Sequence, residues 1–258
     1  MFISTQDLEK IYKDDSVLIL DARSYKDYSN SHIPGAVSLD LFSFHWADTS
    51  QKGLVSFGEH MRKILSYAGI DENKKIIFYD NTSGMLASRG VWMCLYFSHP
   101  DVHLLDGGLS KWTRENLPLV SESTIYKPSN LTTPLDPLVI IGFEELNANI
   151  GKVTIIDARS PDEFDGTTPR AARGGHIPTA VNIDWNNNLD DSGKLKSDKE
   201  LESLYQIDKD TPIVTYCQGA YRAANSYLSL KKLGFKNVKV YLGSWGEWGN
   251  NLELPIEK

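Results

Sequence analysis

One cysteine stands where a reactive thiol is expected. Residues 214–224 read Val-Thr-Tyr-Cys-Gln-Gly-Ala-Tyr-Arg-Ala-Ala, in which a β-branched run ends at Cys217 and a helical pattern follows a short turn. This strand–loop–helix order places the thiol among backbone N–H groups at the start of a helix, and both features favour a thiolate over a thiol. A small buried cysteine at a strand end is the alternative interpretation of this residue taken alone.

The second cysteine and the composition set limits on the function. Cys94 lies in the apolar run 91–97, which predicts helix core, and the two cysteines fit no spacing of a zinc site or a disulfide framework. The formal net charge of −7 over 258 residues, with no Lys/Arg cluster, argues against a nucleic-acid partner. No apolar run approaches the ~20 residues that span a bilayer, and the polar residues 4–7 indicate no secretory signal. We therefore expect a cytoplasmic protein with no membrane partner.

A search for internal repeats predicts the architecture. Four blocks recur in the same order in both halves of the chain: 19–24 with 155–160, 32–37 with 176–181, 77–80 with 214–217, and 107–112 with 243–248. Their spacing is nearly constant, at 136, 144, 137 and 136 positions. The chain is therefore interpreted as a tandem duplication. It has an N-terminal non-catalytic domain at 1–118, a proline-punctuated linker at 119–141 and a C-terminal catalytic domain at 142–258.

Each half alternates short β-branched runs with helical patterns. Strands are predicted near 17–20, 36–38, 76–79 and 102–105, and again near 153–156, 180–183, 213–216 and 238–241. Helices are predicted near 58–68, 85–97 and 108–114, and near 142–149, 198–206, 222–233 and 244–249. This alternation predicts an α/β fold in which each domain is a mostly parallel sheet with helices on both faces. Ligands bind such sheets beyond the carboxyl ends of the strands, where Cys217 is expected.

Two differences between the halves favour the second as the active one. Asp80 stands where the second half has Cys217, and a carboxylate cannot act as a sulfur nucleophile. The spacing between matching blocks also grows from 136 to 144 positions, which indicates an insertion in the second half. The inserted residues lie within 166–175 and include Arg170 and Arg173. Arginine forks suit an oxyanion such as sulfonate or carboxylate, so both are predicted substrate ligands. A solvated surface loop is the alternative interpretation of the insertion.

Features shared by both halves are interpreted as scaffold. Arg23 and Arg159 each follow an aspartate at a strand end, and we expect each to pair with a nearby carboxylate. The histidines of the two His-Ile-Pro blocks, at positions 32 and 176, are expected to make hydrogen bonds at the entry to a strand. His45 and His60 lie in a stretch where the first half has extra residues, and the pattern assigns neither of them a role.

Taken together, the motifs resemble the rhodanese family of sulfurtransferases: Asp-Ala-Arg, His-Ile-Pro, the cysteine loop at a strand end, and Gly-Ser-Trp-Gly-Glu-Trp at 243–248. The tandem form with a first half that lacks the cysteine is similar to thiosulfate and 3-mercaptopyruvate sulfurtransferases. The resemblance covers nearly the whole chain. It implies two tandem rhodanese-like domains and a persulfide on Cys217. It also implies substrate contacts from Arg170 and Arg173, and an anion cradle made by the active-site loop of Gln218, Gly219, Ala220, Tyr221, Arg222 and Ala223.

This resemblance implies ping-pong chemistry. The Cys217 thiolate attacks the outer sulfur of an anionic donor, for which we expect thiosulfate in preference to 3-mercaptopyruvate. Backbone N–H groups of the loop stabilise the persulfide, and a thiophilic acceptor such as cyanide or a thiol then takes the sulfur. No metal or organic cofactor is implied. The family's loops usually read Cys-Arg-Lys-Gly-Val-Thr or Cys-Gly-Ser-Gly-Val-Thr, so Gly219 replaces the side chain that selects the donor.

Two alternatives belong to other functional classes. Phosphatases that share this fold place an arginine six positions after the cysteine, whereas Arg222 follows Cys217 by five. The smaller ring favours one sulfane sulfur over phosphate. The other alternative is a non-enzymatic module, a persulfide relay or redox sensor that acts on a protein partner, and bulky Tyr221 at the loop rim would suit a protein acceptor. Rapid turnover with small donors and acceptors separates an enzyme from a relay.

Overall fold

The computed structural model describes residues 1–258, which form two compact units. Unit 1 comprises Met1–Phe44, Gly58–Asp136 and Leu189–Leu195, and unit 2 comprises His45–Phe57, Pro137–Asn188 and Lys196–Lys258. Each unit is thus completed by a segment from the other half of the sequence. We call residues 45–57 the first arm and residues 189–195 the second arm. The duplicated blocks indicated contiguous domains because neither arm lies in a block that the halves share.

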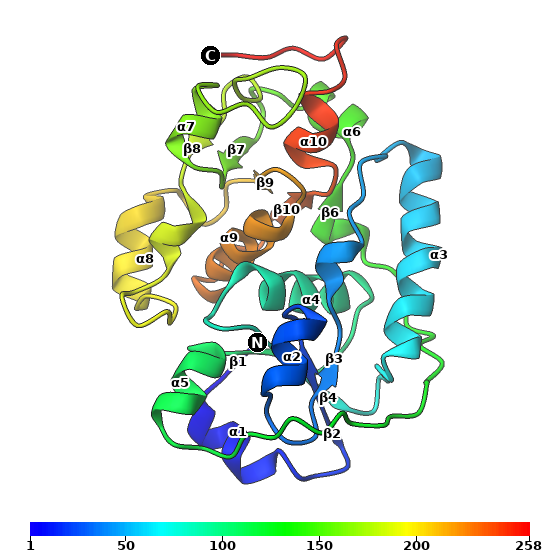
Figure 1. Ribbon diagram of the computed structural model, residues 1–258. Helices are drawn as coiled ribbons and strands as arrows, with labels where there is room; N and C mark the ends of the chain where they lie inside the picture. The colour runs from blue at the N-terminus through cyan, green and yellow to red at the C-terminus, as the bar shows by residue number, and fades with distance from the viewer. The chain divides into compact units, whose positions relative to one another are not determined.

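The two units contain sheets of the same topology. Each has five parallel strands, in the order β1-β5-β4-β2-β3 in unit 1 and β6-β10-β9-β7-β8 in unit 2 (Figure 1). The strand bounds are β1 Phe2–Ile3, β2 Val17–Asp21, β3 Val37–Ser38, β4 Lys75–Tyr79, β5 Val102–Leu105, β6 Ile140–Ile141, β7 Thr154–Asp157, β8 Val181–Asn182, β9 Ile213–Tyr216 and β10 Val238–Tyr241. The predicted α/β fold with two parallel sheets is confirmed.

The helices follow the same repeat. Their bounds are α1 Thr5–Ile11, α2 Tyr25–Asn30, α3 Gln51–Tyr67, α4 Met85–Tyr96, α5 Gly108–Arg114, α6 Phe143–Ala148, α7 Pro161–Phe164, α8 Asp198–Tyr205, α9 Tyr221–Lys232 and α10 Ser244–Trp248, with short 3-10 turns at Leu41–Ser43, Pro137–Val139 and Trp185–Asn188. The sequence prediction missed α1, α2 and α7. Each of them begins after a serine whose side chain caps the first turn.

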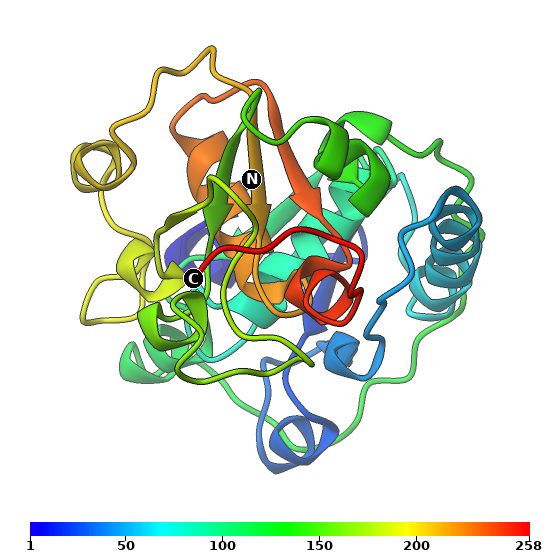
Figure 2. The same cartoon turned by 90° about the horizontal axis from the view of Figure 1, so that it is seen from above.

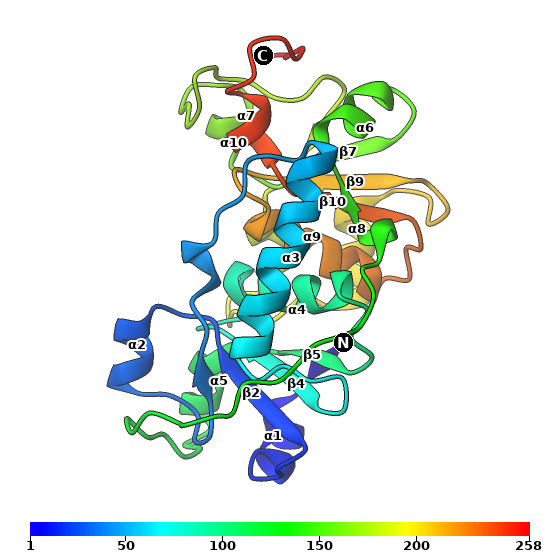
Figure 3. The same ribbon diagram turned by 90° about the vertical axis from the view of Figure 1, so that its right-hand side faces the viewer.

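Helix α3 is longer than the sequence indicated. It begins at Gln51 instead of near 58, and Figure 3 shows it as one unbroken helix. The boundary between the two units falls within it, between Phe57 and Gly58. Its first turns therefore belong to the first arm.

Alternate residues of each strand serve opposite faces of the sheet. In unit 2, Val214 and Tyr216 of β9 pack into a core that also contains Trp245 and Trp248 of α10, whose side chains are fully buried. Thr215, between them, points to the other face, where its hydroxyl donates to a carbonyl at the start of α9. Figure 2 shows the C-terminal segment, in red, leaving α10 and returning to the stretch before β8, where it pairs with His176.

The second sheet begins inside the stretch assigned to the linker. Ile140 and Ile141, the last residues of the predicted linker 119–141, form β6, an edge strand that pairs with β10. Two β-branched residues are too short a run to indicate a strand. They form one because the exposed edge of β10 supplies hydrogen-bond partners.

A buried ion pair fixes the carboxyl end of the second strand in each unit. In unit 2, the Arg159 guanidinium makes two-pronged contact with Asp157, at 2.6 Å from Nη2 to Oδ2, and donates to the Gly175 carbonyl at 2.8 Å. In unit 1, Arg23 contacts Asp21 in the same way. The prediction that these arginines pair with carboxylates is confirmed.

We predict that Arg159→Ala lowers the free energy of unfolding by about 3–5 kcal/mol, because it leaves the Asp157 carboxylate buried without its partner. Urea denaturation measures the loss. The control is Lys10→Ala, which breaks a pair with Asp7 whose two side chains are largely exposed, so the free energy of unfolding should change little. Equal losses in the two variants would contradict the structural role of the buried pair.

Candidate active site

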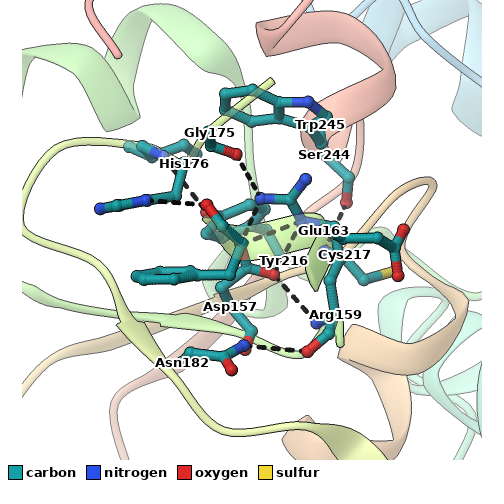
Figure 4. A network of polar contacts seen from close by, with 12 residues as sticks. Asp157, Arg159, Glu163, Gly175, His176, Asn182, Tyr216, Cys217, Ser244 and Trp245 are labelled. Carbon is teal, nitrogen blue, oxygen red and sulfur yellow. Dashed lines mark hydrogen bonds and ion pairs between the residues drawn. The ribbon is translucent and has the colours of Figure 1, made fainter. Parts of the chain in front are cut away.

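Strand β9 delivers Cys217 to a loop that α10 holds in place. Cys217 directly follows the strand and is 1% exposed. Its N–H donates to the Ser244 hydroxyl at 3.2 Å, and its carbonyl accepts the N–H of Trp245 at 2.8 Å. Figure 4 shows Cys217 beside Ser244. The next carbonyl, of Gln218, accepts the N–H of Gly246 at 2.9 Å, so the first turn of α10 fixes both peptides.

The loop closes through a left-handed residue. Ala220 has φ of +67° and is the residue before α9, which begins at Tyr221. The backbone therefore turns sharply between Cys217 and the helix. This brings the thiol to the N-terminal end of a 12-residue helix, where the dipole favours negative charge. The predicted strand, cysteine loop and helix are present.

A largely buried ion pair lies beside the thiol. Arg222 binds Glu163 through two hydrogen bonds, of 2.5 Å from Nη1 to Oε2 and 2.9 Å from Nη2 to Oε1. Burial alone would lower the pKa of Arg222, but its contacts with Glu163 and with the Cys217 sulfur raise that pKa above its usual range. Arg222 is therefore a fixed positive charge at the Cys217 sulfur.

Glu163 is positioned by its own helix. It is the third residue of α7, and it completes a capping box in which Ser160 and Glu163 each accept from the other's backbone. Burial opposes ionisation of Glu163, but the hydrogen bonds and charge of Arg222 outweigh it and lower the carboxyl pKa to about 2. The sequence analysis missed Glu163, although the pattern Ser-Pro-Asp-Glu at 160–163 signals a capped helix start.

The two arginines of the insertion have different surroundings. The Arg170 side chain is 55% exposed, and its Nη1 lies 3.6 Å from Glu163. Arg173 instead donates to four backbone carbonyls near the C-terminus, those of Trp248, Gly249, Asn251 and Leu254. Arg173 thus ties the insertion to the end of the chain, and four of its five N–H groups are occupied. We therefore retain Arg170 alone as a candidate substrate ligand.

Two further residues border the cysteine loop. The amide nitrogen of Gln218 donates to the Arg170 carbonyl at 3.0 Å, which joins the loop to the insertion. The ring of His45 lies over Gly219, so closely that a Cβ at that position would overlap it. The sequence assigned His45 no role. The sequence carried only an indirect sign of His45, namely Gly219, because a glycine in a functional loop indicates that another group closely approaches the backbone.

The matching loop of unit 1 shows what this backbone shape does. Asp80 follows β4, and its buried carboxylate accepts the N–H groups of Thr82, Gly84, Leu86 and Ala87 at 3.0–3.1 Å. The loop therefore gathers several backbone donors around one anion. In unit 1 that anion is a side chain of the chain itself, and the loop carries no nucleophile.

Other residues singled out in the sequence are structural. His32 and His176 stack on Tyr28 and Phe164 and hydrogen-bond the backbone, as expected. Cys94 is fully buried in α4, and burial raises its thiol pKa. No group of three or more His, Cys, Asp or Glu side chains is placed to hold a metal ion, and none of the helices is long and apolar enough to cross a membrane.

Comparison with known proteins decides the family. The model of the rhodanese-like domain matches residues 4–115 and again residues 143–251. The chain belongs to the rhodanese family. This confirms the resemblance inferred from the motifs and the tandem organisation of two rhodanese-like domains.

Relatives of this rhodanese span its full length. It is 32% identical to the thiosulfate sulfurtransferase of Azotobacter vinelandii, over 100% of this chain and 97% of the relative. It is 33% identical to the sulfur carrier protein TtuD of Thermus thermophilus, over 100% and 96%. Among solved structures, SseA of Escherichia coli, a 3-mercaptopyruvate sulfotransferase, matches with a TM-score of 0.80 at 28% identity, covering 95% of this chain and 98% of SseA. The prediction of sulfur transfer is confirmed by these relatives.

We predict that the Glu163–Arg222 pair makes the free energy of unfolding depend on pH in the acid range. Because the folded-state pKa of Glu163 is about 2, below its usual 4.5, the pair stabilises the fold above pH 4.5 and loses this contribution as the pH falls toward 2. Glu163→Gln should therefore be less stable than wild type at pH 7, and the difference should shrink between pH 4.5 and 2. Urea denaturation across this range tests it, with exposed Glu253→Gln as control. A difference that does not change with pH would contradict the pairing.

Proposed function

We propose that the chain transfers a sulfane sulfur from thiosulfate to a thiophilic acceptor, cyanide or a thiol, through a persulfide on Cys217. The observation that carries this proposal is the setting of the thiol. Cys217 lies at a strand end and at the start of α9, with the Arg222 guanidinium held against its sulfur by Glu163. A thiolate is the form that attacks sulfur.

The reaction has two half-reactions. In the first, the Cys217 thiolate attacks the outer sulfur of thiosulfate, the S–S bond of the donor breaks, and its electron pair leaves with sulfite. In the second, the acceptor attacks the terminal sulfur of the persulfide and the thiolate returns. Backbone N–H groups from Gln218 to Ala223 stabilise the persulfide charge, as the matching loop in unit 1 does for the Asp80 carboxylate.

Thiosulfate is the favoured donor. Relatives named thiosulfate sulfurtransferase, from Azotobacter vinelandii and Pseudomonas aeruginosa, match over at least 93% of the chain, whereas the 3-mercaptopyruvate enzyme SseA is less similar in sequence. The side chain that would select the donor from within the loop is missing at Gly219. Steady-state rates with thiosulfate and 3-mercaptopyruvate, measured side by side, decide between the donors.

The non-enzymatic relay is not favoured, because several of these relatives are named as enzymes. A protein nevertheless remains a proposed acceptor, since another relative is named a sulfur carrier protein. We retain the cytoplasm as the proposed location. Both cysteines are unpaired, and a thiol that must cycle through a persulfide suits a reducing compartment.

We predict that Cys217→Ser abolishes sulfur transfer, because serine cannot form the persulfide. The matched control is Cys94→Ser, in which the replaced thiol is fully buried in α4 and should not be reached by the donor. Intact-mass measurement after thiosulfate treatment should show one added sulfur on wild type and on the Cys94 variant, and none on the Cys217 variant. A persulfide on Cys94 would overturn the assignment.

We also predict that Arg170→Ala weakens the donor step. A hydrogen bond to a charged group contributes about 1.5–3 kcal/mol, so losing one lowers kcat/KM for thiosulfate by roughly 10- to 150-fold. The rate with a neutral acceptor thiol should change much less, because that step need not hold an anion. Arg173→Ala is the control. Because Arg173 donates to backbone carbonyls, this variant should lower the free energy of unfolding measured in urea. An unchanged donor step in Arg170→Ala would reduce the insertion to an ordinary surface loop.

A further inference from the structure

Unit 2 has a cleft at the end of its sheet opposite to Cys217. The first residues of β9, Ile213 and Val214, line this cleft, whereas Cys217 follows the last residue of the same strand. Helix α6 and strand β10 also contribute to the lining. The volume of the cleft is about 260 Å³. An apolar cavity of about 150 Å³ already holds benzene, so this cleft suits one aromatic ring with a short side chain.

The walls of the cleft are largely apolar. Ile141 and Val214 are buried and line it together with Val153 and Pro212. Leu138, which is 71% exposed, lines it as well. An apolar group that enters the cleft is therefore removed from water by side chains that are already in place, and this burial favours binding.

A lysine ammonium borders these apolar walls. Lys239 of β10 lines the cleft, and its Nζ donates to the Glu145 carboxylate of α6 at 2.7 Å. An ammonium group has three N–H donors, so two remain for a ligand. Lys236, which is exposed, contributes a second positive charge to the lining. The cleft thus combines apolar walls with cations, which complement a molecule that has an apolar body and a negative charge.

The matching place in unit 1 holds a carboxylate of the chain itself. The strand registers match His103 of β5 with Lys239 of β10, and Asp101 with Asn237. In unit 1, Lys75 Nζ donates to the Asp101 carboxylate at 2.8 Å, and the Nε2 atom of His103 lies 2.5 Å from the same carboxylate. Unit 2 keeps a cation at this position but has a neutral amide in place of the carboxylate.

A second exchange makes the wall apolar. Pro212 precedes β9 where Lys75 begins the matching strand β4, as the repeated blocks 77–80 and 214–217 show. The charged cluster of unit 1 is thus replaced in unit 2 by an apolar cleft that retains Lys239. The two exchanges together change a site that the chain fills with its own carboxylate into one that can take a carboxylate from solution.

We propose that this cleft binds a small monocarboxylate with an apolar body. The apolar part contacts Ile141, Val153 and Pro212, and the carboxylate accepts hydrogen bonds from the Lys239 ammonium. The carboxylate of the ligand takes the place that the Asp101 carboxylate has in unit 1. Binding is reversible and forms no covalent bond. The site is separate from the sulfur chemistry, because it lies at the opposite end of β9 from Cys217.

Two probes that differ in charge test this proposal. Phenylacetate and phenylacetamide carry the same ring, but only phenylacetate carries a carboxylate. In an NMR titration of the whole chain, the shifted backbone amides should lie at 138–153, 212–214 and 236–239. Phenylacetate should bind about 5-fold more tightly than phenylacetamide, as expected for a partly exposed ion pair. Equal affinities for the two probes, or shifts confined to other residues, would overturn the proposal.

Substitutions at the cations and carboxylates should change the affinity for phenylacetate in opposite directions. Lys239→Gln should weaken it about 5-fold and leave the affinity for phenylacetamide unchanged. Glu145→Gln should strengthen it, because this variant removes a carboxylate that competes for Lys239. Asn237→Asp should weaken it about 5-fold, because this variant gives unit 2 the carboxylate that unit 1 has. Lys152→Gln is the control: its Nζ donates to the Ala148 carbonyl, and phenylacetate should bind as to wild type.

The outcomes that contradict the proposal are distinct. Wild-type affinity in Lys239→Gln would overturn the assigned carboxylate contact, and so would weaker binding of phenylacetate to Glu145→Gln. Thiosulfate, added at constant ionic strength, should leave the affinity for phenylacetate unchanged. Competition between the two would place phenylacetate beside Cys217 and would also overturn the proposal. None of these results depends on whether the chain takes sulfur from thiosulfate.

Discussion

The buried pair of Asp157 and Arg159 is the interaction on which the active half depends. One guanidinium joins the end of β7, through Asp157, to the stretch before β8, through the Gly175 carbonyl. It also lies 4.6 Å from the centre of the Trp245 ring in α10, the helix that holds the cysteine loop. The strand next to β7 is β9, which ends at the nucleophile. The position of Cys217 thus depends on the Arg159 guanidinium, which is itself fully buried. Unit 1 keeps the same pair without the chemistry, as expected of scaffold.

Around the thiol, the charges divide into two classes according to their burial. Arg222 is mostly buried and bound to Glu163, so it has one position beside the Cys217 sulfur. Arg170 and His45 are exposed, so they lie where solvent reaches the loop. This division matters in a chain whose net charge is −7, because long-range attraction gives a small anion little help. Recognition of an anionic donor must then come from short contacts at the rim.

The sequence predicted those parts of the site that depend on local pattern. Cys217 was identified because a β-branched run, a glycine turn and a helix are all visible within a few residues. The duplicated blocks separated scaffold, such as Arg23 and Arg159, from the insertion. The roles of Arg170 and Arg173 could not be distinguished from the sequence. They differ because backbone carbonyls near the C-terminus bind Arg173 and not Arg170, and these carbonyls are distant in sequence. Glu163 and His45 were missed because their partners lie far away in sequence.

The arms carry a consequence for how such a chain can arise and be divided. Residues 45–57 complete unit 2 and residues 189–195 complete unit 1, and each arm follows the same short edge strand, β3 or β8, of its own half. In a single-copy protein of this kind, an arm would reach a cysteine loop only by exchange with a second copy, as in a swapped dimer. Duplication turns that exchange into an intramolecular one, independent of protein concentration. A chain cut in the linker would therefore place Cys217 and His45 on different fragments, although both fragments would keep every residue of their own sheet.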